Sequence, residues 1–190
     1  MLECAVMKIA IIGAQNTGKS TFIADLIATF PVYSTPKQTY RELVRAEHLP
    51  INQETSTESQ KAIRDFLYAQ LKDNTEEHVF FDRTVIDNFV YTALAVERGT
   101  VKKELLLETK KLMFESLSLL DRLFFIPTAV SIKLAPDQLR DIDTNFIDSA
   151  NHRFIATLFE IARISPIAID VIAGTREERV KVVKQIIQPS

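Results

Sequence analysis

Glycine, cysteine and tryptophan are scarce in this chain: its 190 residues include four glycines, one cysteine and no tryptophan. A single cysteine excludes an intramolecular disulfide, and Cys4 is expected to be a small buried side chain. No group of cysteine and histidine has the spacing of a metal site, so the common zinc modules are excluded. With so few glycines, the position of each one is informative.

Strong net charge and long apolar runs are also missing. The formal net charge of -2 argues against a strongly electrostatic binder of nucleic acid or of a membrane surface. No apolar run reaches the length that crosses a bilayer, and Met1–Cys4 lacks the basic start of a signal peptide. A hydrophobic content of 46% fits one globular domain over residues 1–190. These features favour a soluble cytoplasmic protein.

Two of the four glycines lie in one segment, Gly13–Ser20, which reads GAQNTGKS and matches the pattern G-x-x-x-x-G-K-[ST]. The apolar run over residues 5–12 precedes it and predicts a buried strand. Apolar residues at helical spacing follow it as far as Pro31. A strand, a glycine turn and a helix together predict a P-loop that binds a nucleoside triphosphate; a chance glycine turn before a helix is the alternative.

Each residue type in this segment has a role in binding ATP with Mg²⁺. The two glycines let the backbone approach the phosphates, and the helix N-terminus adds its positive dipole end. Lys19 is predicted to reach the β- and γ-phosphates, and the Ser20 hydroxyl to bind Mg²⁺. The predicted nucleotide-binding residues are Gly13, Ala14, Gln15, Asn16, Thr17, Gly18, Lys19, Ser20 and Thr21, with Gly174 and Thr175 after the last strand.

The rest of the chain alternates apolar strands with amphipathic helices. Strands are expected near residues 78–82, 122–126 and 167–172, with a short one near 31–34, and helices near 56–72, 85–98, 102–120, 144–164 and 176–187. This alternation predicts an α/β fold of three layers, with a mostly parallel sheet and helices on both faces. Ligands are expected at the carboxyl ends of the strands.

Asp82, Arg83 and Asp87 form a second group of candidates. Asp82 ends an apolar strand, where a P-loop site places its second metal-side acid; it could bind Mg²⁺ through water or accept a proton from an acceptor hydroxyl. Arg83 would then face phosphate, and Asp87 could pair with Arg83 or touch the substrate. The alternative is that Asp82 only caps the following helix.

Two further segments supply arginines. Arg41 is a candidate ligand of phosphate or acceptor beside Glu42, a candidate general base; the alternative is an ordinary solvated helix face. Arg140 and Arg153 flank the start of a late helix, where arginines of a mobile segment can close over a transferring phosphoryl group. The alternative for these two is pairing of surface charges.

Missing motifs narrow the class of P-loop protein. A regulatory GTPase needs an Asp-x-x-Gly switch and an Asn-Lys-x-Asp guanine reader, and neither occurs in the sequence. A motor-type or AAA+ ATPase is normally larger and carries a hydrophobic-Asp-Glu pair, whereas Asp82 is followed by Arg83. The size and the Asp-Arg pair favour a small kinase.

Four segments in order, Gly13–Ser20, Thr39–Glu42, Phe80–Asp87 and Leu139–Asp143, resemble the AAA-28-type P-loop ATPases. The resemblance covers about residues 6 to 185. These proteins are similar to the ribosylnicotinamide-kinase domain of NadR-type proteins and, more distantly, to deoxynucleoside and thymidylate kinases. The resemblance implies a five-stranded sheet of order 2-3-1-4-5, with the Asp82 strand beside the glycine-loop strand. It also implies a lid that contains Arg140 and an adenine site beside residues 173–175.

The first functional hypothesis is a Mg²⁺-dependent kinase that transfers the γ-phosphoryl group of ATP to a small nucleoside- or nucleotide-like acceptor. The alternative is an ATP-binding switch or slow ATPase that acts through a protein partner. A homodimer is one expected assembly. The predicted catalytic residues are Lys19, Asp82, Arg83, Arg140 and Glu42; the acceptor ligands are Arg41, Asp87 and Arg153; the metal ligands are Ser20 and Asp82; and the candidate aromatic clamps are Tyr40, Tyr68, Phe81 and Tyr91.

Overall fold

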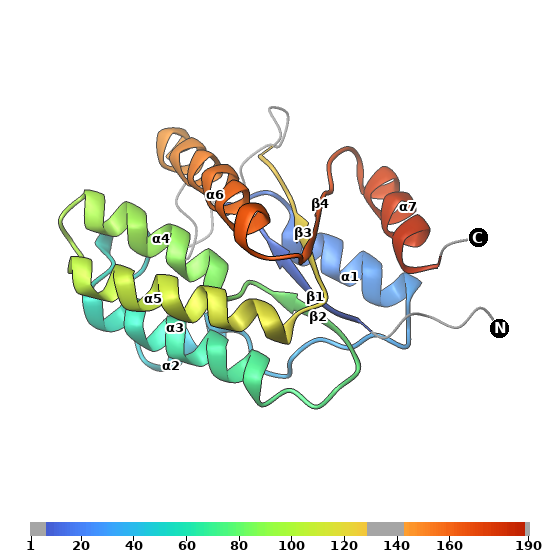
Figure 1. The fold of residues 1–190 in the computed structure, drawn as a ribbon, viewed down its shortest axis with the longest axis horizontal. Coiled ribbons are helices and arrows are strands. Elements are labelled where there is room, and N and C mark those ends of the chain that lie inside the picture. Colours follow the sequence, from blue (N-terminus) through green and yellow to red (C-terminus); the bar gives the residue numbers. More distant parts are fainter. Residues whose placement is uncertain (1–6, 129–142, 189–190) are drawn as a thin grey trace.

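A parallel sheet of four strands forms the centre of the computed structural model, which describes residues 7–128 and 143–188 (Figure 1). The strand order is β2-β1-β3-β4, and every neighbouring pair is parallel. The strands are β1 (Met7–Ile12), β2 (His78–Asp82), β3 (Arg122–Phe125) and β4 (Ala168–Val171). Because the strands are parallel, their carboxyl ends and the loops that follow them meet at one edge of the sheet.

Helices cover both faces of this sheet, which confirms the predicted three layers (Figure 1). Helices α1 (Lys19–Thr29) and α7 (Arg176–Ile187) pack together on one face. The other face carries a larger apolar cluster and the remaining helices. These are α2 (Tyr40–Ala46), α3 (Thr57–Lys72), α4 (Val85–Glu97), α5 (Lys103–Ser116) and α6 (Thr144–Ile164), with short 3₁₀ turns at Asn52–Glu54 and Leu117–Leu119.

Strand β1 shows why both faces are covered. Ile9 and Ile11 point into the cluster beneath α1 and α7, while Ala10 and Ile12 point into the larger cluster on the other face. All four side chains are fully buried. A strand whose alternate residues both meet apolar helices reads as a continuous apolar run, and this is the pattern that the sequence shows before the glycine loop.

The five strands implied by the resemblance become four in the described residues, in an otherwise matching order. The segment predicted as a strand near residues 31–34 pairs with β2 through one parallel bridge, Ser34 with Val79. Ser34 lies on the outer side of β2, where the missing strand belongs. Pro31 and Pro36 flank it, and prolines cannot donate the backbone hydrogen bonds that would extend the pairing.

The helix predicted over residues 102–120 is also shorter than expected. Helix α5 ends at Ser116, and a 3₁₀ turn, Leu117–Leu119, follows it. The Ser116 hydroxyl donates a hydrogen bond of 2.7 Å to the carbonyl of Met113, which competes with continuation of the helix.

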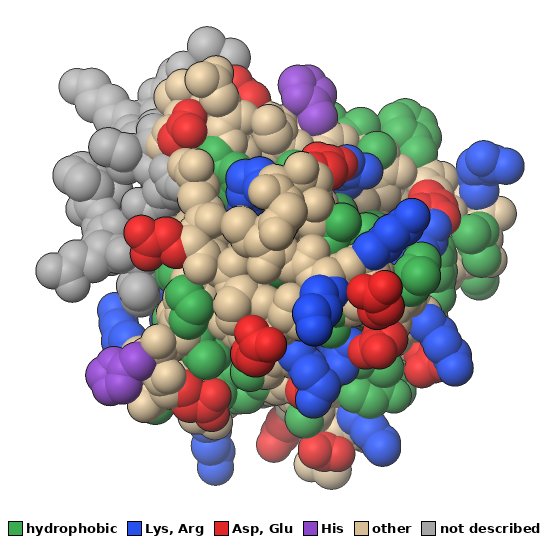
Figure 2. All heavy atoms as spheres, turned by 90° about the vertical axis from the view of Figure 1, so that its left-hand side faces the viewer, with side chains coloured by type: hydrophobic (Ala, Val, Ile, Leu, Met, Phe, Trp, Pro, Cys, Tyr) green, Lys and Arg blue, Asp and Glu red, His purple; other side chains and the backbone are tan. Residues whose placement is uncertain are grey.

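The surface carries charges of both signs. On the face shown in Figure 2, Lys and Arg side chains alternate with Asp and Glu side chains and do not gather into a basic area. In the part of the chain that the structure describes, no helix combines the length and the apolar character needed to span a membrane.

Candidate active site

The glycine loop, residues 13–20, joins the end of β1 to the start of α1. Gly13 has a φ of 145° and Gly18 a φ of 82°, both in the region that favours glycine. A Cβ on Gly13 would lie 2.4 Å from the carbonyl oxygen of Ile126, so the loop lies directly against the chain that leaves β3. Asn16 is also left-handed, with a φ of 62°. Such a loop turns backbone N–H groups to one side and forms a nest for an anion.

Lys19 lies buried at the first position of α1. Its Nζ donates hydrogen bonds to the carbonyl oxygens of Gly13, at 2.6 Å, and Ala14, at 2.5 Å, and it lies 3.4 Å from the hydroxyl of Thr17. Burial lowers the pKa of Lys19 to about 7, and the nearby Arg83 guanidinium adds to the effect. The ammonium group therefore lies inside the loop at the point where phosphate oxygens would be cradled.

Ser20 and Asp82 meet at the carboxyl edge of the sheet. The Ser20 hydroxyl donates to the Asp82 carboxylate at 3.3 Å, which joins the start of α1 to the end of β2. Hydroxyl and carboxylate oxygens are ligands that Mg²⁺ accepts, and it usually takes its other ligands from water and phosphate. Across residues 7–128 and 143–188, no cluster of three or more His, Cys, Asp and Glu side chains could hold a metal by itself. The pair therefore fits a Mg²⁺ ion that arrives with a nucleotide.

Asp82 does not cap the helix that follows it. The N-cap of α4 is Thr84, whose side chain accepts a hydrogen bond from the Ile86 N–H, and Asp87 completes the capping box. The Asp82 carboxylate is thus left at the edge of the sheet with Ser20. The alternative that Asp82 only caps the following helix is therefore excluded.

Arg83 forms a tight turn between β2 and α4. Its φ of 72° is left-handed, and its N–H donates to the carbonyl of Ile11 on β1. The guanidinium lies 4.7 Å from the centre of the Tyr40 ring and 5.4 Å from that of Tyr91. Burial alone would lower the pKa of Arg83, but the two tyrosines and the neighbouring Asp87 raise it above its ordinary value. Arg83 is therefore a buried, permanently charged group at the end of β2.

Asp87 connects α4 to the glycine loop. One carboxylate oxygen accepts the N–H of Thr84 at 3.0 Å, and the other lies 3.4 Å from the N–H of Gly13. Burial raises the pKa of Asp87 to about 6, although Arg83 and Lys19 act in the opposite direction. The predicted acceptor ligand is thus also a structural link between the two halves of the site.

A pocket lies beside the glycine loop on the α3 and α4 side of the sheet. Gln15 belongs to both the loop and the pocket, and its N–H donates to the Tyr91 hydroxyl at 3.0 Å. Burial raises the pKa of Tyr91, so the phenol stays neutral. The lining residues are Gln15, Tyr40, Ile51, Asn52, Gln60, Ile63, Leu67, Arg83, Asp87, Asn88 and Tyr91.

Sequence reasoning did not identify the amides of this pocket. Gln60 on α3 accepts hydrogen bonds from Asn88, at 2.8 Å, and Thr92, at 3.2 Å, both on α4. Its amide nitrogen donates to the hydroxyl of Thr55 at 2.9 Å. A signal was present, since Gln60 shares the buried side of α3 with Ile63, where a polar residue needs partners.

A second hollow lies next to the predicted metal ligands. Its lining residues are Ser20, Ile23, Thr35, Pro36, Gln38, Thr39, Gln70 and Asp82. Glu42 does not line it; its carboxylate accepts hydrogen bonds from the N–H of Thr39, at 2.6 Å, and from the Thr39 hydroxyl, at 3.0 Å. These bonds lower the pKa of Glu42, and the bond from the Thr39 N–H belongs to the capping box of α2, in which the Thr39 hydroxyl oxygen accepts from the Glu42 N–H. Arg41, one residue before, lies 6.0 Å from the Tyr40 ring centre.

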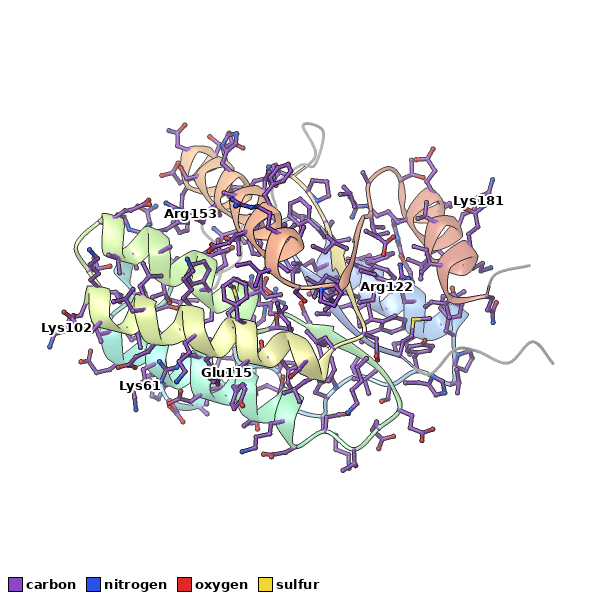
Figure 3. All side chains as sticks on the ribbon, in the orientation of Figure 1. Lys61, Lys102, Glu115, Arg122, Arg153 and Lys181 are labelled. Atoms are coloured by element: carbon purple, nitrogen blue, oxygen red, sulfur yellow. The ribbon has the colours of Figure 1, made fainter. Side chains whose placement is uncertain are left out.

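Of the two arginines predicted near the late helix, the structure describes only Arg153. Arg140 lies outside the described residues. Arg153 lies in the middle of α6 (Figure 3) and pairs with Glu97 of α4, and both side chains are partly exposed. This is the surface ion pair that the sequence offered as the alternative for Arg153.

The loop after β4 reaches the glycine loop through a residue that the sequence reading missed. Thr175 caps α7 together with Glu178, and Gly174 has a φ of 100°. Arg179, on α7, donates to the carbonyl of Gly174 at 3.0 Å and to the carbonyl of Thr17 at 3.0 Å. Thr21 lies exposed in the first turn of α1. The predicted nucleotide-binding residues are therefore brought together around one loop.

Comparison with known proteins agrees with this geometry. A family model described as AAA domain matches residues 8–179. Comparison with curated proteins gives no match.

Solved structures of low sequence identity share the fold. NadR protein in complex with NR superposes with a TM-score of 0.73 at 15% identity, over 96% of this chain and 51% of that one, so this chain spans about half of the NadR chain. Deoxyadenosine kinase from M. mycoides gives 0.71 at 16% identity over 95% and 98% of the two chains. Thymidylate kinase from Candida albicans gives 0.68 at 19% identity over 97% and 92%.

Proposed function

The chain belongs to the AAA-28-type family of AAA domains, and from this premise we propose that it is a Mg²⁺-dependent kinase. It transfers the γ-phosphoryl group of ATP to a small nucleoside- or nucleotide-like acceptor. Its fold is that of P-loop nucleoside and nucleotide kinases. The names of the two superposed kinases support an acceptor of this class.

One observation carries the proposal: the pocket lies directly against the glycine loop. Gln15 is a residue of that loop and a lining residue of the pocket, and Asp87 touches both. An acceptor in the pocket would therefore lie beside the phosphates of a nucleotide in the loop. A switch that acts through a protein partner needs no such pocket.

The residues of the loop suggest how the donor would be held. Lys19 would leave the carbonyls of Gly13 and Ala14 for the phosphates, where its charge has a stronger partner. Ser20 and Asp82 would hold Mg²⁺, which neutralises charge on the phosphates when it is bound. Preorganised positive groups of this kind stabilise charge that develops during transfer.

The pocket suggests how the acceptor would be held and activated. Arg83 presents a fixed positive charge near the rings of Tyr40 and Tyr91, which suits an anionic or planar group. Asp82 lines the neighbouring hollow and directly precedes Arg83, so it is the candidate to accept the proton of an acceptor hydroxyl if it binds Mg²⁺ only through water. The Glu42 carboxylate already accepts two hydrogen bonds from Thr39.

An acceptor panel tests the proposal. ADP release is measured with ATP, Mg²⁺ and, in turn, nucleosides, nucleotides and sugars, and the product is identified by mass. Stimulation by a nucleoside or nucleotide, with a phosphorylated product, is the expected result. Slow ATP hydrolysis that no acceptor stimulates would replace the kinase by the ATPase alternative. The Lys19→Ala variant is the control for contaminating kinases.

A further inference from the structure

The Arg179 side chain bonds both the glycine loop and the loop after β4. Its Nε donates to the carbonyl of Gly174, and its Nη1 to the carbonyl of Thr17, each at 3.0 Å. We propose that Arg179 is a positioning residue that fixes these two loops relative to each other. The glycine loop would then hold the phosphates of a nucleotide, and the loop after β4 would be in place to contact its base.

Burial and charge set this residue apart from the other cations of α7. Arg179 is 7% exposed, and burial lowers its pKa. Arginine still remains charged at neutral pH, because its ordinary pKa is above 12. A buried cation that bonds two carbonyl oxygens is costly unless those bonds form, so the contact holds the loops firmly. Lys181, two residues further along α7, instead points to solvent (Figure 3).

The position of the two loops explains what the link would do. The acceptor pocket and the Ser20–Asp82 pair lie on one side of the glycine loop. A transferring phosphate must face that side, so the nucleoside part of the donor has to leave on the other. In the sheet, β4 and β2 lie on opposite sides of β1, and Thr17 and Gly18 contact Arg179 of the helix after β4: its guanidinium bonds the Thr17 carbonyl and would lie 3.6 Å from a Cβ on Gly18. The loop that holds Gly174 therefore borders the path of the base.

Because Arg179 links the two loops, its loss should affect ATP and inorganic tripolyphosphate differently. Inorganic tripolyphosphate needs only the glycine loop, whereas ATP also needs the neighbouring loop in place. Loss of Arg179 should therefore weaken ATP more than tripolyphosphate. The inference rests on the proposed function only through nucleotide binding and does not require that an acceptor be phosphorylated.

Affinities of ATP and of tripolyphosphate, both with Mg²⁺, test the inference by calorimetry on wild-type protein and on Arg179→Ala. We expect the Kd for ATP to rise about tenfold and that for tripolyphosphate to change less than about twofold. Arg179→Lys, which keeps the charge and part of the donor set, should recover part of the ATP affinity. Lys181→Ala, which removes a solvent-exposed cation from the same helix, should change neither value.

Hydrogen exchange of the nucleotide-free protein gives a second readout that does not depend on ligand binding. Exchange at residues 172–175 should accelerate in Arg179→Ala and stay unchanged in Lys181→Ala. Unchanged exchange in Arg179→Ala would overturn the inference, and so would an equal loss of ATP and tripolyphosphate affinity, which indicates a general charge effect. Failure of every acceptor, with the ATP-specific loss intact, would instead overturn the kinase proposal and leave this inference standing.

Discussion

The proposed donor side and the proposed acceptor side of the site are built in different ways. The glycine loop is one continuous segment, residues 13–20, and its shape follows from backbone conformation at Gly13 and Gly18. The acceptor pocket is assembled from side chains of several elements, among them Tyr40 of α2, Gln60 of α3 and Tyr91 of α4. The glycine loop can be recognised from a short stretch of sequence. The pocket forms only after the helices have packed.

The two sides also hold their cations differently. Lys19 is held by backbone carbonyls, and the Arg83 guanidinium lies near the rings of Tyr40 and Tyr91. Carbonyl oxygens and aromatic rings carry no formal charge, so Arg83, and Lys19 when it is protonated, can still bind phosphate oxygens. Asp87 joins the two sides by contacting both the glycine loop and the start of α4.

Removal of Lys19 should break the donor side and give the largest effect. Lys19→Ala is expected to lower ATP turnover by at least about a hundredfold, because the group that meets the phosphates is lost. Stability should change little, since the substitution also removes a buried cation. Turnover is measured as ADP release, and unfolding by denaturant titration. Normal turnover in a folded variant would contradict the assignment of the site.

Raising the pH should weaken the donor side without a substitution. Lys19 has a pKa of about 7 in the nucleotide-free protein, and it must be protonated to bind phosphate. Affinity for ATP should therefore be constant below pH 7 and fall above it, by up to about tenfold per pH unit, with uptake of about one proton at pH 8. Calorimetry in buffers of different ionisation enthalpy measures this uptake. Lys19→Arg should bind without it; the same uptake in that variant would assign the proton to another group.

Asp87→Asn should weaken the connection between the two sides. The amide keeps one oxygen acceptor but cannot accept both N–H groups, so we expect a loss of about 1 kcal/mol of stability and a roughly fivefold fall in kcat/KM for the acceptor. Glu178→Gln is the matched control, because Glu178 completes the same type of capping box on α7. Equal falls in kcat/KM for both variants would reduce Asp87 to an ordinary cap.

Glu42→Gln should have the smallest effect, and it tests whether Glu42 is a general base or only a helix cap. The variant is expected to slow transfer to the acceptor two- to threefold, roughly the effect of a loosened α2, and to leave ATP affinity unchanged. Transfer is followed in single turnovers and ATP binding by calorimetry. A fall of a hundredfold in transfer alone would make Glu42 the general base. Equal small effects on transfer and on ATP binding would exclude it from that role.

Much of the donor side could be predicted, because its signals are local. The glycine loop is predicted by the spacing of its glycines between a strand and a helix. Asp82 is predicted because it is an acidic residue at the end of an apolar strand. At Glu42 the local signal has two meanings: Thr39 and Glu42 have the spacing of a capping box, which the structure contains, while the position of Glu42 beside Arg41 also favours a general base.

Long-range partners account for what could not be predicted. Arg179 bonds the carbonyl of Thr17, a residue 162 positions earlier, and no periodicity reports such a contact. Likewise, the segment near Ser34 has strand-like composition, but its pairing depends on where the chain lies against β2 and on the two prolines that flank it. The helix and sheet layers follow from the hydrophobic pattern of the sequence. The contacts of Arg179 and Ser34 depend on how distant segments pack together.

The absence of tryptophan gives the pocket an optical property. Ultraviolet emission of the protein comes from its four tyrosines, and two of them, Tyr40 and Tyr91, line the pocket next to Arg83. Tyr33 instead stacks on Phe80 at a centroid distance of 4.4 Å, on the opposite face of the sheet. Occupancy of the pocket should therefore alter a large share of the intrinsic fluorescence, so that the protein reports its own acceptor without a label.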